Sequence, residues 1–239
     1  MATLKLTFED IYIKVGEFLG LGSAATGTDL TKIKKLTLRG YANFLMPIDA
    51  STGITYRWFF LQQTTTLSTI STVDAYKLPV GFSSLIIPFY NSSAVSYFNP
   101  QERPLEFIRD LKSSATSTGY PRYFAIRTGT YSQLTGQQYE VVFWPTPTAV
   151  STYNYTYIQI PNAPINDDDV FVGNDLASEA ILECALSLAE LQENDIIGIH
   201  TQKAEKLVQQ LIGDDKRVSS MSNTEPILPI PQQKEKRTP

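Results

Sequence analysis

The sequence predicts an α+β fold in which helices from both ends of the chain form a helical bundle, and a central antiparallel β-sandwich or barrel forms a second lobe. Apolar residues recur at helical spacing near both ends, whereas the middle alternates with period two and is rich in β-branched and aromatic residues. Four prolines after residue 225 predict an extended C-terminal arm. The expected parts are N-terminal helices (1–54), a β-rich lobe (55–165), C-terminal helices (166–218) and a proline-rich arm (219–239).

Composition argues against most metal, thiol and membrane chemistry. The 239 residues are 42% hydrophobic and 11% aromatic, which is enough to bury a sizeable core. A single cysteine, Cys184, and a single histidine, His200, leave no material for a disulfide framework or a zinc or iron–sulfur site. No apolar run approaches the ~18 residues of a membrane span, and the first residues do not resemble a secretory signal. We therefore expect no cofactor, no membrane partner and synthesis in the cytosol.

Charge is unevenly distributed along the chain. Residues 1–160 carry a net charge of +3, whereas residues 161–239 carry −7. Nucleic acid binding requires a basic face that displaces counterions from phosphates. The acidic C-terminal third therefore argues against C-terminal helices that hold DNA.

Two helices are expected before residue 55. Thr7 is suited to cap a helix from about residue 8 to 19, with Glu9 and Asp10 in the first turn, where the helix dipole favours anions. Glycines between residues 20 and 27 interrupt the pattern, and Asp29 is expected to cap a second helix. The apolar face of this second helix comprises Leu30, Ile33, Leu36, Tyr41, Phe44 and Leu45. Its other faces carry the basic residues Lys32, Lys34, Lys35 and Arg39.

The middle of the chain predicts strands separated by turn residues about every 8 to 12 positions. The candidate strands are Tyr56–Leu61, Thr65–Thr72, Ala75–Leu78, Leu85–Tyr90, Arg122–Arg127, Gln138–Trp144 and Thr152–Ile160. In the last of these, three tyrosines alternate with other residues, which indicates a strand with two different faces. Residues 104–112 instead predict a short helix, because proline is favoured in the first helical turn.

The longest helix is expected to begin at Asn174 or Asp175, either of which could cap it, and to run to about Glu193. Its apolar stripe contains several alanines, which allow another helix to approach closely. Cys184 lies on this stripe and is interpreted as a small buried apolar side chain. A last helix is expected to end near residue 212, with Gly213 as its C-cap.

No motif typical of catalysis or ligand binding is complete. Residues 20–25 have dinucleotide-binding glycine spacing, but they follow a helix rather than a strand. Asp167–Asp169 could begin a calcium loop, yet two of the ligand positions are valines. His200 has no recognisable nucleophile and is interpreted as a surface or helix-end histidine. Arginines with aromatic neighbours leave single-strand binding as an alternative that the net charge disfavours. We expect no catalytic residue, no metal site and no enzymatic activity.

Five short segments of the β region, followed by an alanine- and leucine-rich helix, are informative as an ordered set. They are YRWFFL (Tyr56–Leu61), YKLPVGF (Tyr76–Phe82), TGYPRYFAI (Thr118–Ile126), VVFWPTP (Val141–Pro147) and YNYTYIQIP (Tyr153–Pro161). In this order they resemble the head-to-tail adaptor proteins of tailed bacteriophages, also called connector or head completion proteins, of the tail tubular protein A type. The resemblance covers most of the chain from Met1 to about Asp214.

The resemblance implies a structural virion protein at the head–tail junction, made in the cytoplasm of a bacterial host. It implies a homo-oligomeric ring of about twelve copies. In such a ring the helical part docks beneath the portal protein, and the β-rich lobe faces the tail nozzle or tail tubular protein, with tail fibres as a further partner. DNA passes through the channel without specific binding.

Two sets of residues are candidate contacts in such an assembly. Those expected to meet the portal or a neighbouring subunit are Lys32, Lys34, Lys35, Arg39, Ile227, Leu228 and Ile230. Acidic residues expected to face the DNA channel are Glu179, Glu183, Glu190 and Glu193, with Asp195 beside them. A solvated outer face is the alternative for the acidic set. The alternative function for the whole chain is a β-sandwich binding module of a phage fibre, collar or decoration protein, with tyrosines that bind a carbohydrate or protein ligand.

Overall fold

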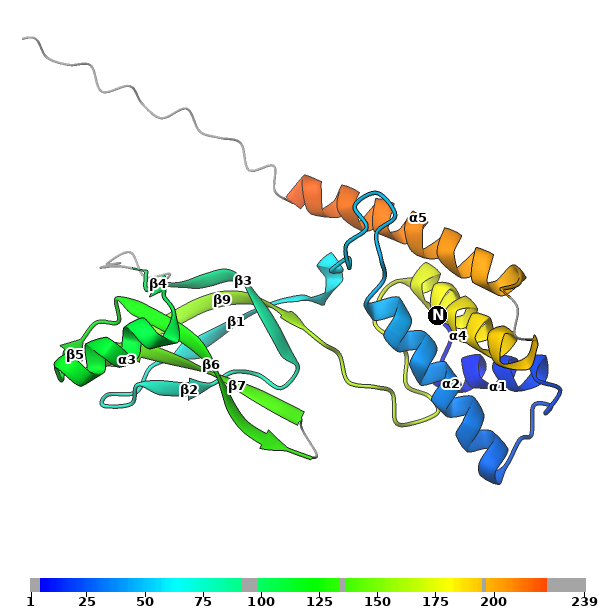
Figure 1. Cartoon of the computed structure of the whole chain (residues 1–239), viewed down its shortest axis with the longest axis horizontal. Coiled ribbons are helices and arrows are strands. Elements are labelled where there is room, and N and C mark those ends of the chain that lie inside the picture. The colour runs from blue at the N-terminus through cyan, green and yellow to red at the C-terminus, as the bar shows by residue number, and fades with distance from the viewer. Residues whose placement is uncertain (1–4, 92–98, 134–135, 195–196, 223–239) are drawn as a thin grey trace, which may run out of the picture.

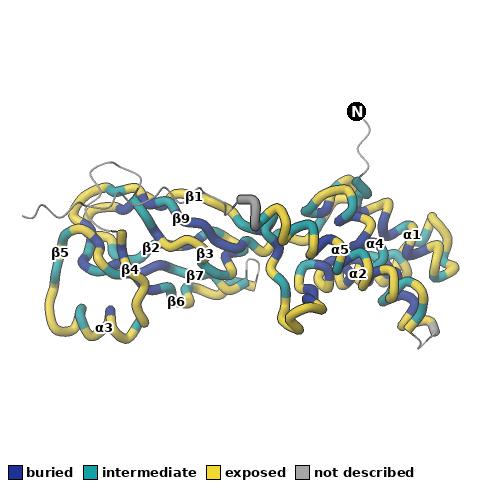
Figure 2. The backbone as a smooth tube through the Cα atoms, turned by 90° about the horizontal axis from the view of Figure 1, so that it is seen from above, coloured by how far each residue is buried: buried dark blue, intermediate teal, exposed yellow. Residues whose placement is uncertain are grey.

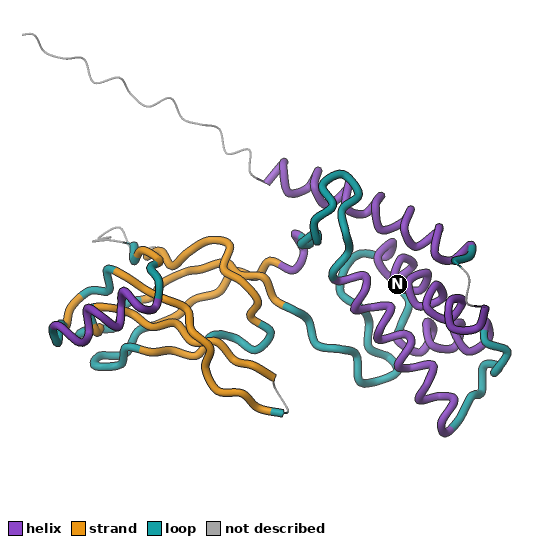
Figure 3. Tube along the Cα trace, in the orientation of Figure 1, coloured by secondary structure: helices purple, strands orange, loops and turns teal. Residues whose placement is uncertain are grey.

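The computed structural model describes residues 5–91, 99–133, 136–194 and 197–222. Two lobes lie side by side along the long axis of the molecule (Figure 1). Four helices form one lobe, and the strands with one further helix form the other (Figure 3). The chain passes between the lobes twice, once before the first strand and once after the last one. The predicted α+β class is therefore confirmed.

The first helix, α1, spans Phe8–Phe18 and begins at the predicted cap. Thr7 Oγ1 accepts a hydrogen bond from the backbone N–H of Asp10 at 3.1 Å, and the Asp10 carboxylate accepts one from the N–H of Thr7 at 2.9 Å. This reciprocal capping box satisfies N–H groups that the start of a helix leaves open. The sequence alone was sufficient to locate this helix.

The second helix, α2, spans Gly27–Leu45, so the prediction that Asp29 caps it is wrong. The N-cap is Thr26, which makes no side-chain cap hydrogen bond. The helix begins where the chain turns, because Gly27 has a φ of +62°, a conformation that favours glycine. Asp29 lies in the first turn instead, where its charge faces the positive end of the helix dipole.

Helix α4, Asp175–Asn194, packs against the other helices of its lobe. The side chain of Asn174 caps it, since Asn174 Oδ1 accepts a hydrogen bond from the N–H of Ala177 at 2.9 Å. The alanine stripe admits α2 at close range, as predicted. A Cβ atom added at Gly40 would lie 2.6 Å from the backbone of Ala185, so only glycine fits at this crossing.

The last helix, α5, spans Ile199–Ser222 and continues through Gly213, where the sequence predicted its end. A glycine inside a helix costs roughly 0.5–1 kcal/mol. Polar contacts beyond that glycine hold the helix in place. The Asp215 carboxylate accepts hydrogen bonds from the hydroxyl of Tyr56 at 2.8 Å and from the N–H of Phe59 at 2.7 Å. Tertiary contacts therefore override the local stop signal.

The helical lobe has an apolar core to which all four of its helices contribute. Its fully buried members include Phe8, Ile11, Val15, Ile33, Phe44, Ala180, Ile181, Ala185, Leu211 and Ile212. Buried stretches of chain run through both lobes, and exposed stretches lie around them (Figure 2). A separate aromatic core lies within the β lobe.

Two main sheets and a two-stranded one form the β lobe. The first has the antiparallel order β1-β9-β3, with β1 at Gln62–Ser68, β9 at Thr152–Gln159 and β3 at Phe82–Asn91. The second has the order β2-β7-β6-β4, with β2 at Ala75–Lys77, β7 at Gly136–Trp144, β6 at Tyr123–Ser132 and β4 at Gln101–Glu102. They form a sandwich rather than a barrel, because the two sheets share no strand.

Two short pairings depart from the predicted antiparallel arrangement. Strand β4 pairs with β6 in parallel, and β5 (Thr118–Gly119) pairs in parallel with β8 (Thr146–Pro147). Each involves a two-residue strand, which is too short to show a period in the sequence.

Aromatic side chains fill the space between the two sheets. The predicted alternation in β9 is confirmed, because Tyr153, Tyr155 and Tyr157 are all buried in this core. Phe89 lies at its centre, with its ring centroid 4.7 Å from that of Tyr155 and 5.4 Å from that of Phe143. Ring pairs at such distances add to the free energy that burial provides.

Helix α3, Leu105–Ser114, covers the outer face of the second sheet and confirms the predicted short helix. Its buried side chain, Ile108, packs against Ala125 of β6 and Val142 of β7. The neighbours of Val142 in sequence, Val141 and Phe143, belong to the core between the sheets. Strand β7 therefore alternates between two apolar environments, as a strand covered on both faces should.

The strand predicted at Tyr56–Leu61 is wrong. This segment ends in a 3-10 turn, η1, at Phe59–Leu61, and Trp58 is fully buried in the helical core. Trp58 Nε1 donates a hydrogen bond to the carbonyl of Phe44 at 2.9 Å, and the two rings stack with centroids 5.0 Å apart. Aromatic enrichment, which favoured a strand, here serves to anchor the first connection to the helices.

The remaining predicted strands are confirmed with changed ends. The strand predicted at Thr65–Thr72 corresponds to β1 and stops at Ser68. The hydroxyl of Thr69 then donates to the carbonyl of Ala149 at 3.0 Å, and Thr72 has a φ of +70°, so the chain turns there. Strand ends are set by such turn contacts, which the period of a sequence does not reveal.

The two segments that cross the junction contribute to both cores. Leu61, directly before β1, and Ile158, near the end of β9, belong to the helical core. Leu67 of β1 and Tyr157 of β9 belong to the aromatic core. Consecutive residues of β9 therefore lie in different lobes' cores, and β1 and β9 pair side by side between them.

Candidate interaction surface

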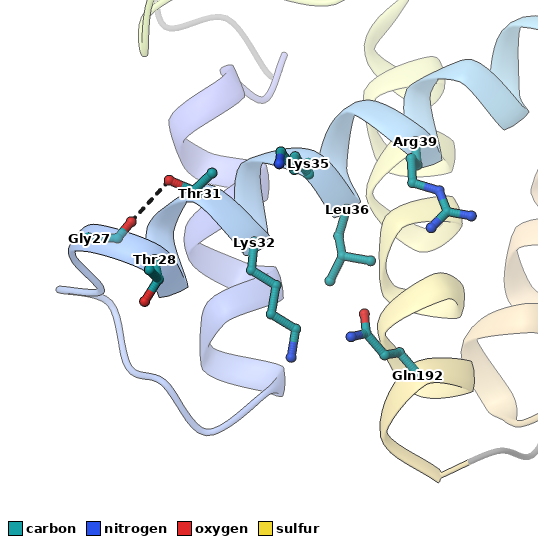
Figure 4. Close-up of a pocket in the computed structure, with 8 residues that line it drawn as sticks. All are labelled: Gly27, Thr28, Thr31, Lys32, Lys35, Leu36, Arg39 and Gln192. Carbon is teal, nitrogen blue, oxygen red and sulfur yellow. Dashed lines mark hydrogen bonds between the residues drawn. The ribbon is translucent and has the colours of Figure 1, made fainter.

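The outer side of α2 carries an exposed basic surface. Lys32, Lys35 and Arg39 are all exposed, and their spacing of three and four residues places them on one side of the helix. They border a groove of about 700 Å³ between α2 and the end of α4 (Figure 4). We call this groove, with its three cations, the basic groove. It is lined by Gly27, Thr28, Thr31, Lys32, Lys35, Leu36, Arg39 and Gln192.

The local fold explains why these cations point outward. The opposite side of α2 is buried against α1 and α4 through Ile33, Thr37 and Gly40, which leaves the basic residues on the solvent side. Lys32 and Leu36 extend from α2 toward Gln192 on α4 (Figure 4). Leu36 is buried and provides an apolar surface beneath the charges. The groove therefore combines an apolar base with a cationic rim.

The three cations have no counter-charge among the described residues of the free chain. Within residues 5–91, 99–133, 136–194 and 197–222, none of them makes a hydrogen bond or an ion pair. Their mutual repulsion, and the positive end of the α2 dipole close by, favour an anion over water in this groove. An exposed ion pair adds only about 0.2–1 kcal/mol, so a partner must engage several of them together.

The fourth basic residue of the predicted set has a different position. Lys34 Nζ lies 2.7 Å from Asp167 Oδ1, and it also lies over the rings of Phe8, at 5.5 Å, and Tyr12, at 4.7 Å. Burial, with Asp167 and Glu9 nearby, raises the pKa of Tyr12 to about 12. Lys34 therefore connects α2 to α1 and to the loop before α4 and is not part of the basic groove.

The predicted acidic set is divided in the same way. Glu190 is only 7% exposed and accepts a hydrogen bond from the backbone N–H of His200 at 3.2 Å. Glu183 Oε2 lies 2.7 Å from Nδ1 of the same histidine, and Lys203 lies 3.8 Å from Glu183 Oε1. These two carboxylates hold α4 against the start of α5. His200 is a helix-end residue, as predicted.

The other acidic candidates remain available to a partner or a channel. Glu179 and Glu193 are exposed on α4. Asp195 lies outside the described residues, as do Ile227, Leu228 and Ile230 of the predicted arm. Helix α5 reaches Ser222, so it includes the first four residues of that predicted arm.

Among the residues that the structure describes, no set of groups typical of an active site comes together. Burial raises the pKa of the Cys184 thiol to about 12, which suits the predicted apolar role. In the described part of the chain, no three side chains among histidine, cysteine, aspartate and glutamate are placed to hold a metal ion. No helix of that part is long and apolar enough to cross a membrane.

Sequence reasoning missed the groove while it identified the cations. The spacing of Lys32, Lys35 and Arg39 was a sufficient signal for a basic helix side. Gln192 is distant in sequence and enters the groove only because α4 packs beside α2, so no local pattern could reveal it.

Comparison with known proteins places most of the chain in one family. A protein family model described as SU10 adaptor protein matches residues 26–226. The matched region contains α2, the basic groove, both sheets and the two C-terminal helices. No curated protein matches the chain significantly.

Proposed function

The chain belongs to the SU10 adaptor protein family, and on this premise we propose that it is a structural virion protein, a bacteriophage head-to-tail adaptor, rather than an enzyme. The single observation that carries the proposal is the family match, which extends over both lobes. About twelve copies form a ring between the portal and the tail nozzle. DNA passes through this ring without specific binding.

The basic groove is the contact that the helical lobe offers to an acidic segment of the portal or of a neighbouring subunit. Its three cations act together on one partner segment, and Leu36 adds apolar area beneath them. Each such contact is weak in a monomer. Closure of a ring multiplies it, because every subunit is held by two neighbours and by the portal at once.

The remaining acidic candidates are suited to line a channel through which DNA passes without binding. Glu179 and Glu193 are exposed, and carboxylates that line a channel repel phosphates. Glu183 and Glu190 serve the contact between α4 and α5 and are not part of this proposal. The β lobe then faces the tail tubular protein, with tail fibres as a further partner.

The family match favours this role over a fibre, collar or decoration module. Such a module would use the sandwich alone, whereas the matched residues include helices on both sides of it in sequence. The tyrosines that suggested ligand binding are also largely core residues, since Tyr153, Tyr155 and Tyr157 are buried.

Electron microscopy of the chain mixed with the portal protein of the same phage tests the proposal. We expect rings of about twelve copies attached to portals. The triple variant Lys32→Glu, Lys35→Glu, Arg39→Glu should require at least ~10-fold more protein for half-maximal attachment, which corresponds to about 1.4 kcal/mol.

A matched control carries the same charge change elsewhere. Lys14, Arg109 and Lys206 are exposed and lie outside the groove, so their replacement by glutamate should leave attachment unchanged. Absence of rings with the unmodified chain would contradict the adaptor role. Equal attachment of the two triple variants would contradict the role of the groove alone.

A further inference from the structure

A second groove, on the β lobe, has a chemistry that the adaptor role does not explain. It measures about 670 Å³ and lies between the segment 117–122 and the end of β7. We call it the aromatic groove. It is lined by Ser117, Thr118, Gly119, Tyr120, Pro121, Arg122, Trp144 and Pro145.

Backbone hydrogen bonds hold the two walls of the aromatic groove together. The N–H of Arg122 donates to the carbonyl of Trp144 at 2.9 Å, and the N–H of Thr146 donates to the carbonyl of Ser117 at 3.0 Å. The parallel pairing of β5 with β8 continues from the second of these bonds. The groove is therefore built into the sandwich and is not a chance gap between loops.

The lining of the groove suits an extended proline-rich peptide. Tyr120 is 59% exposed and, beside the half-buried Trp144, supplies flat apolar surface, while Arg122 supplies an exposed charge. Grooves lined by aromatic side chains bind polyproline II segments, which enter with little loss of conformational entropy.

Trp144 gives an independent reason to expect a ligand with a hydrogen-bond acceptor. Its Nε1–H is buried and has no hydrogen-bond partner among the described residues. A buried donor without an acceptor costs free energy. The backbone carbonyls of a polyproline II segment make no internal hydrogen bonds, so they are free to accept this one. Because the donor is enclosed in the free chain, the groove must open slightly at Trp144 for a peptide carbonyl to reach it.

The chain itself contains a segment of the required kind. Pro226, Pro229 and Pro231 form a P-x-x-P pattern with a further proline, and Glu225 precedes them with a charge opposite to that of Arg122. The segment belongs to the 17 residues that follow α5, residues 223–239. In polyproline II form such a length extends for about 50 Å, which is enough to reach another subunit.

We propose that residues 225–231 of one copy bind in the aromatic groove of a neighbouring copy, with a backbone carbonyl accepting the Trp144 N–H and Glu225 paired with Arg122. The proposal rests on the proposed function only for the presence of that neighbour in a ring. On this proposal the two grooves of each subunit have different roles. The basic groove recruits by charge, and the arm links one β lobe to the next.

Two full-length variants, mixed in solution, test the proposal. The first is labelled with ¹⁵N and carries Pro226→Ala, Pro229→Ala and Pro231→Ala, so it keeps the groove but lacks the proline pattern. The second is unlabelled and carries Trp144→Phe, so it keeps the proline pattern but lacks the donor. Only contact between two copies can then bring a proline segment to the labelled groove.

The labelled chain reports through its two tryptophan indole N–H signals in an NMR spectrum. Trp58 is fully buried and donates to a backbone carbonyl, so its signal verifies folding and serves as an internal control. We expect the Trp144 signal to shift and saturate as the unlabelled variant is added, while the Trp58 signal stays fixed. A partner that also lacks the three prolines should bind at least ~10-fold more weakly.

A charge exchange provides a second measurement. Arg122→Glu in the labelled chain should weaken binding, and Glu225→Arg in the unlabelled chain should restore it. An unmoved Trp144 signal, or an equal shift with the proline-free partner, would overturn the proposal. The proposal would also be overturned if the Trp144 signal of the labelled chain with its prolines intact differed from that of the proline-free variant at every protein concentration. The arm would then occupy the groove of its own chain. None of these measurements involves the portal, so their failure leaves the adaptor role to its own test.

Discussion

Individual polar side chains determine how the end of α5 meets the rest of the helical lobe. Asp49 lies in the loop after α2, and its carboxylate accepts hydrogen bonds from Lys216 Nζ at 2.6 Å and from the hydroxyl and N–H of Ser51 at 2.7 and 3.0 Å. These hydrogen bonds, chiefly the one from Lys216, hold the pKa of Asp49 well below its usual range. The carboxylate therefore stabilises the fold only while it is ionised.

The sign of the pH dependence follows from that lowered pKa. A group with a lowered pKa in the folded state contributes stability above its unfolded pKa of about 3.9, and the contribution is lost as pH falls toward the folded value. Asp49→Asn should therefore lower the urea midpoint at pH 7, followed by far-ultraviolet circular dichroism. The difference from the unmodified chain should shrink at pH 3.

Asp168→Asn is the control for this prediction, because Asp168 is exposed and makes no ion pair in the described residues. It should leave the midpoint unchanged at both pH values. A destabilisation by Asp49→Asn that persists undiminished below pH 3 would show that the charge is not responsible.

For individual residues, the sequence predicted where charged side chains lie on the helices but not which other residues they contact. It identified four basic residues on α2, but Lys34 pairs with Asp167, 133 positions away. It grouped four acidic residues, yet Glu190 is buried at a contact with α5. Which charges are engaged depends on residues distant in sequence, and no local pattern encodes that.

Among the elements, the crossing of α2 and α4 depends on the absence of a side chain at Gly40. A methyl group at Gly40 would lie 2.6 Å from the backbone of Ala185, so the two helices would have to move apart to accommodate it. Gly213, inside α5, has no atom within 4 Å of the same position. The two glycines therefore respond in opposite ways to the same substitution.

Gly40→Ala should lower the free energy of unfolding by about 1–3 kcal/mol, the usual cost of overpacking. Gly213→Ala should raise it by about 0.4–1 kcal/mol, because alanine is the better helix former and reduces the freedom of the unfolded chain. Thermal unfolding followed by circular dichroism measures both. Stabilisation by the first change, or destabilisation by the second, would contradict the packing described here.

The elements were the part of the fold most open to prediction. Capping at Thr7 and Asn174, the alanine stripe of α4 and the tyrosine alternation of β9 each act through neighbours in sequence. The misassigned strand at Tyr56–Leu61 and the continuation of α5 past Gly213 both depend on packing between distant segments. Tertiary contacts decided those two cases against local propensity.

For the whole molecule, the prediction concerns assembly rather than folding. Deletion of residues 225–239 removes no side chain of either core, so circular dichroism and the unfolding midpoint should match those of the full chain. Attachment of the truncated chain to portal rings should weaken, because one of the contacts between neighbours is lost. Unchanged attachment would show that the arm does not contribute to assembly.

At the same scale, the sequence was sufficient to suggest the family and the α+β class, since both depend on the order of elements along the chain. It could not locate either groove. The basic groove forms where α2 passes α4, and the aromatic groove forms where the segment before β6 pairs with the end of β7. Both are products of how elements meet in space.

Two segments that cross the junction, Leu61 with β1 and the strand β9, take part in both cores, and this has a mechanical consequence. Leu61 and Ile158 are embedded among the helices, while Leu67 and Tyr157 are embedded in the sandwich. The start of β1 and the end of β9 lie together at the junction, so tension that pulls the lobes apart acts on both strands at once. It loads the hydrogen bonds between β9 and β3 in shear, several together, instead of opening them one after another. Such a linkage resists sudden force, which is the demand that a pressurised capsid makes on whatever joins it to a tail.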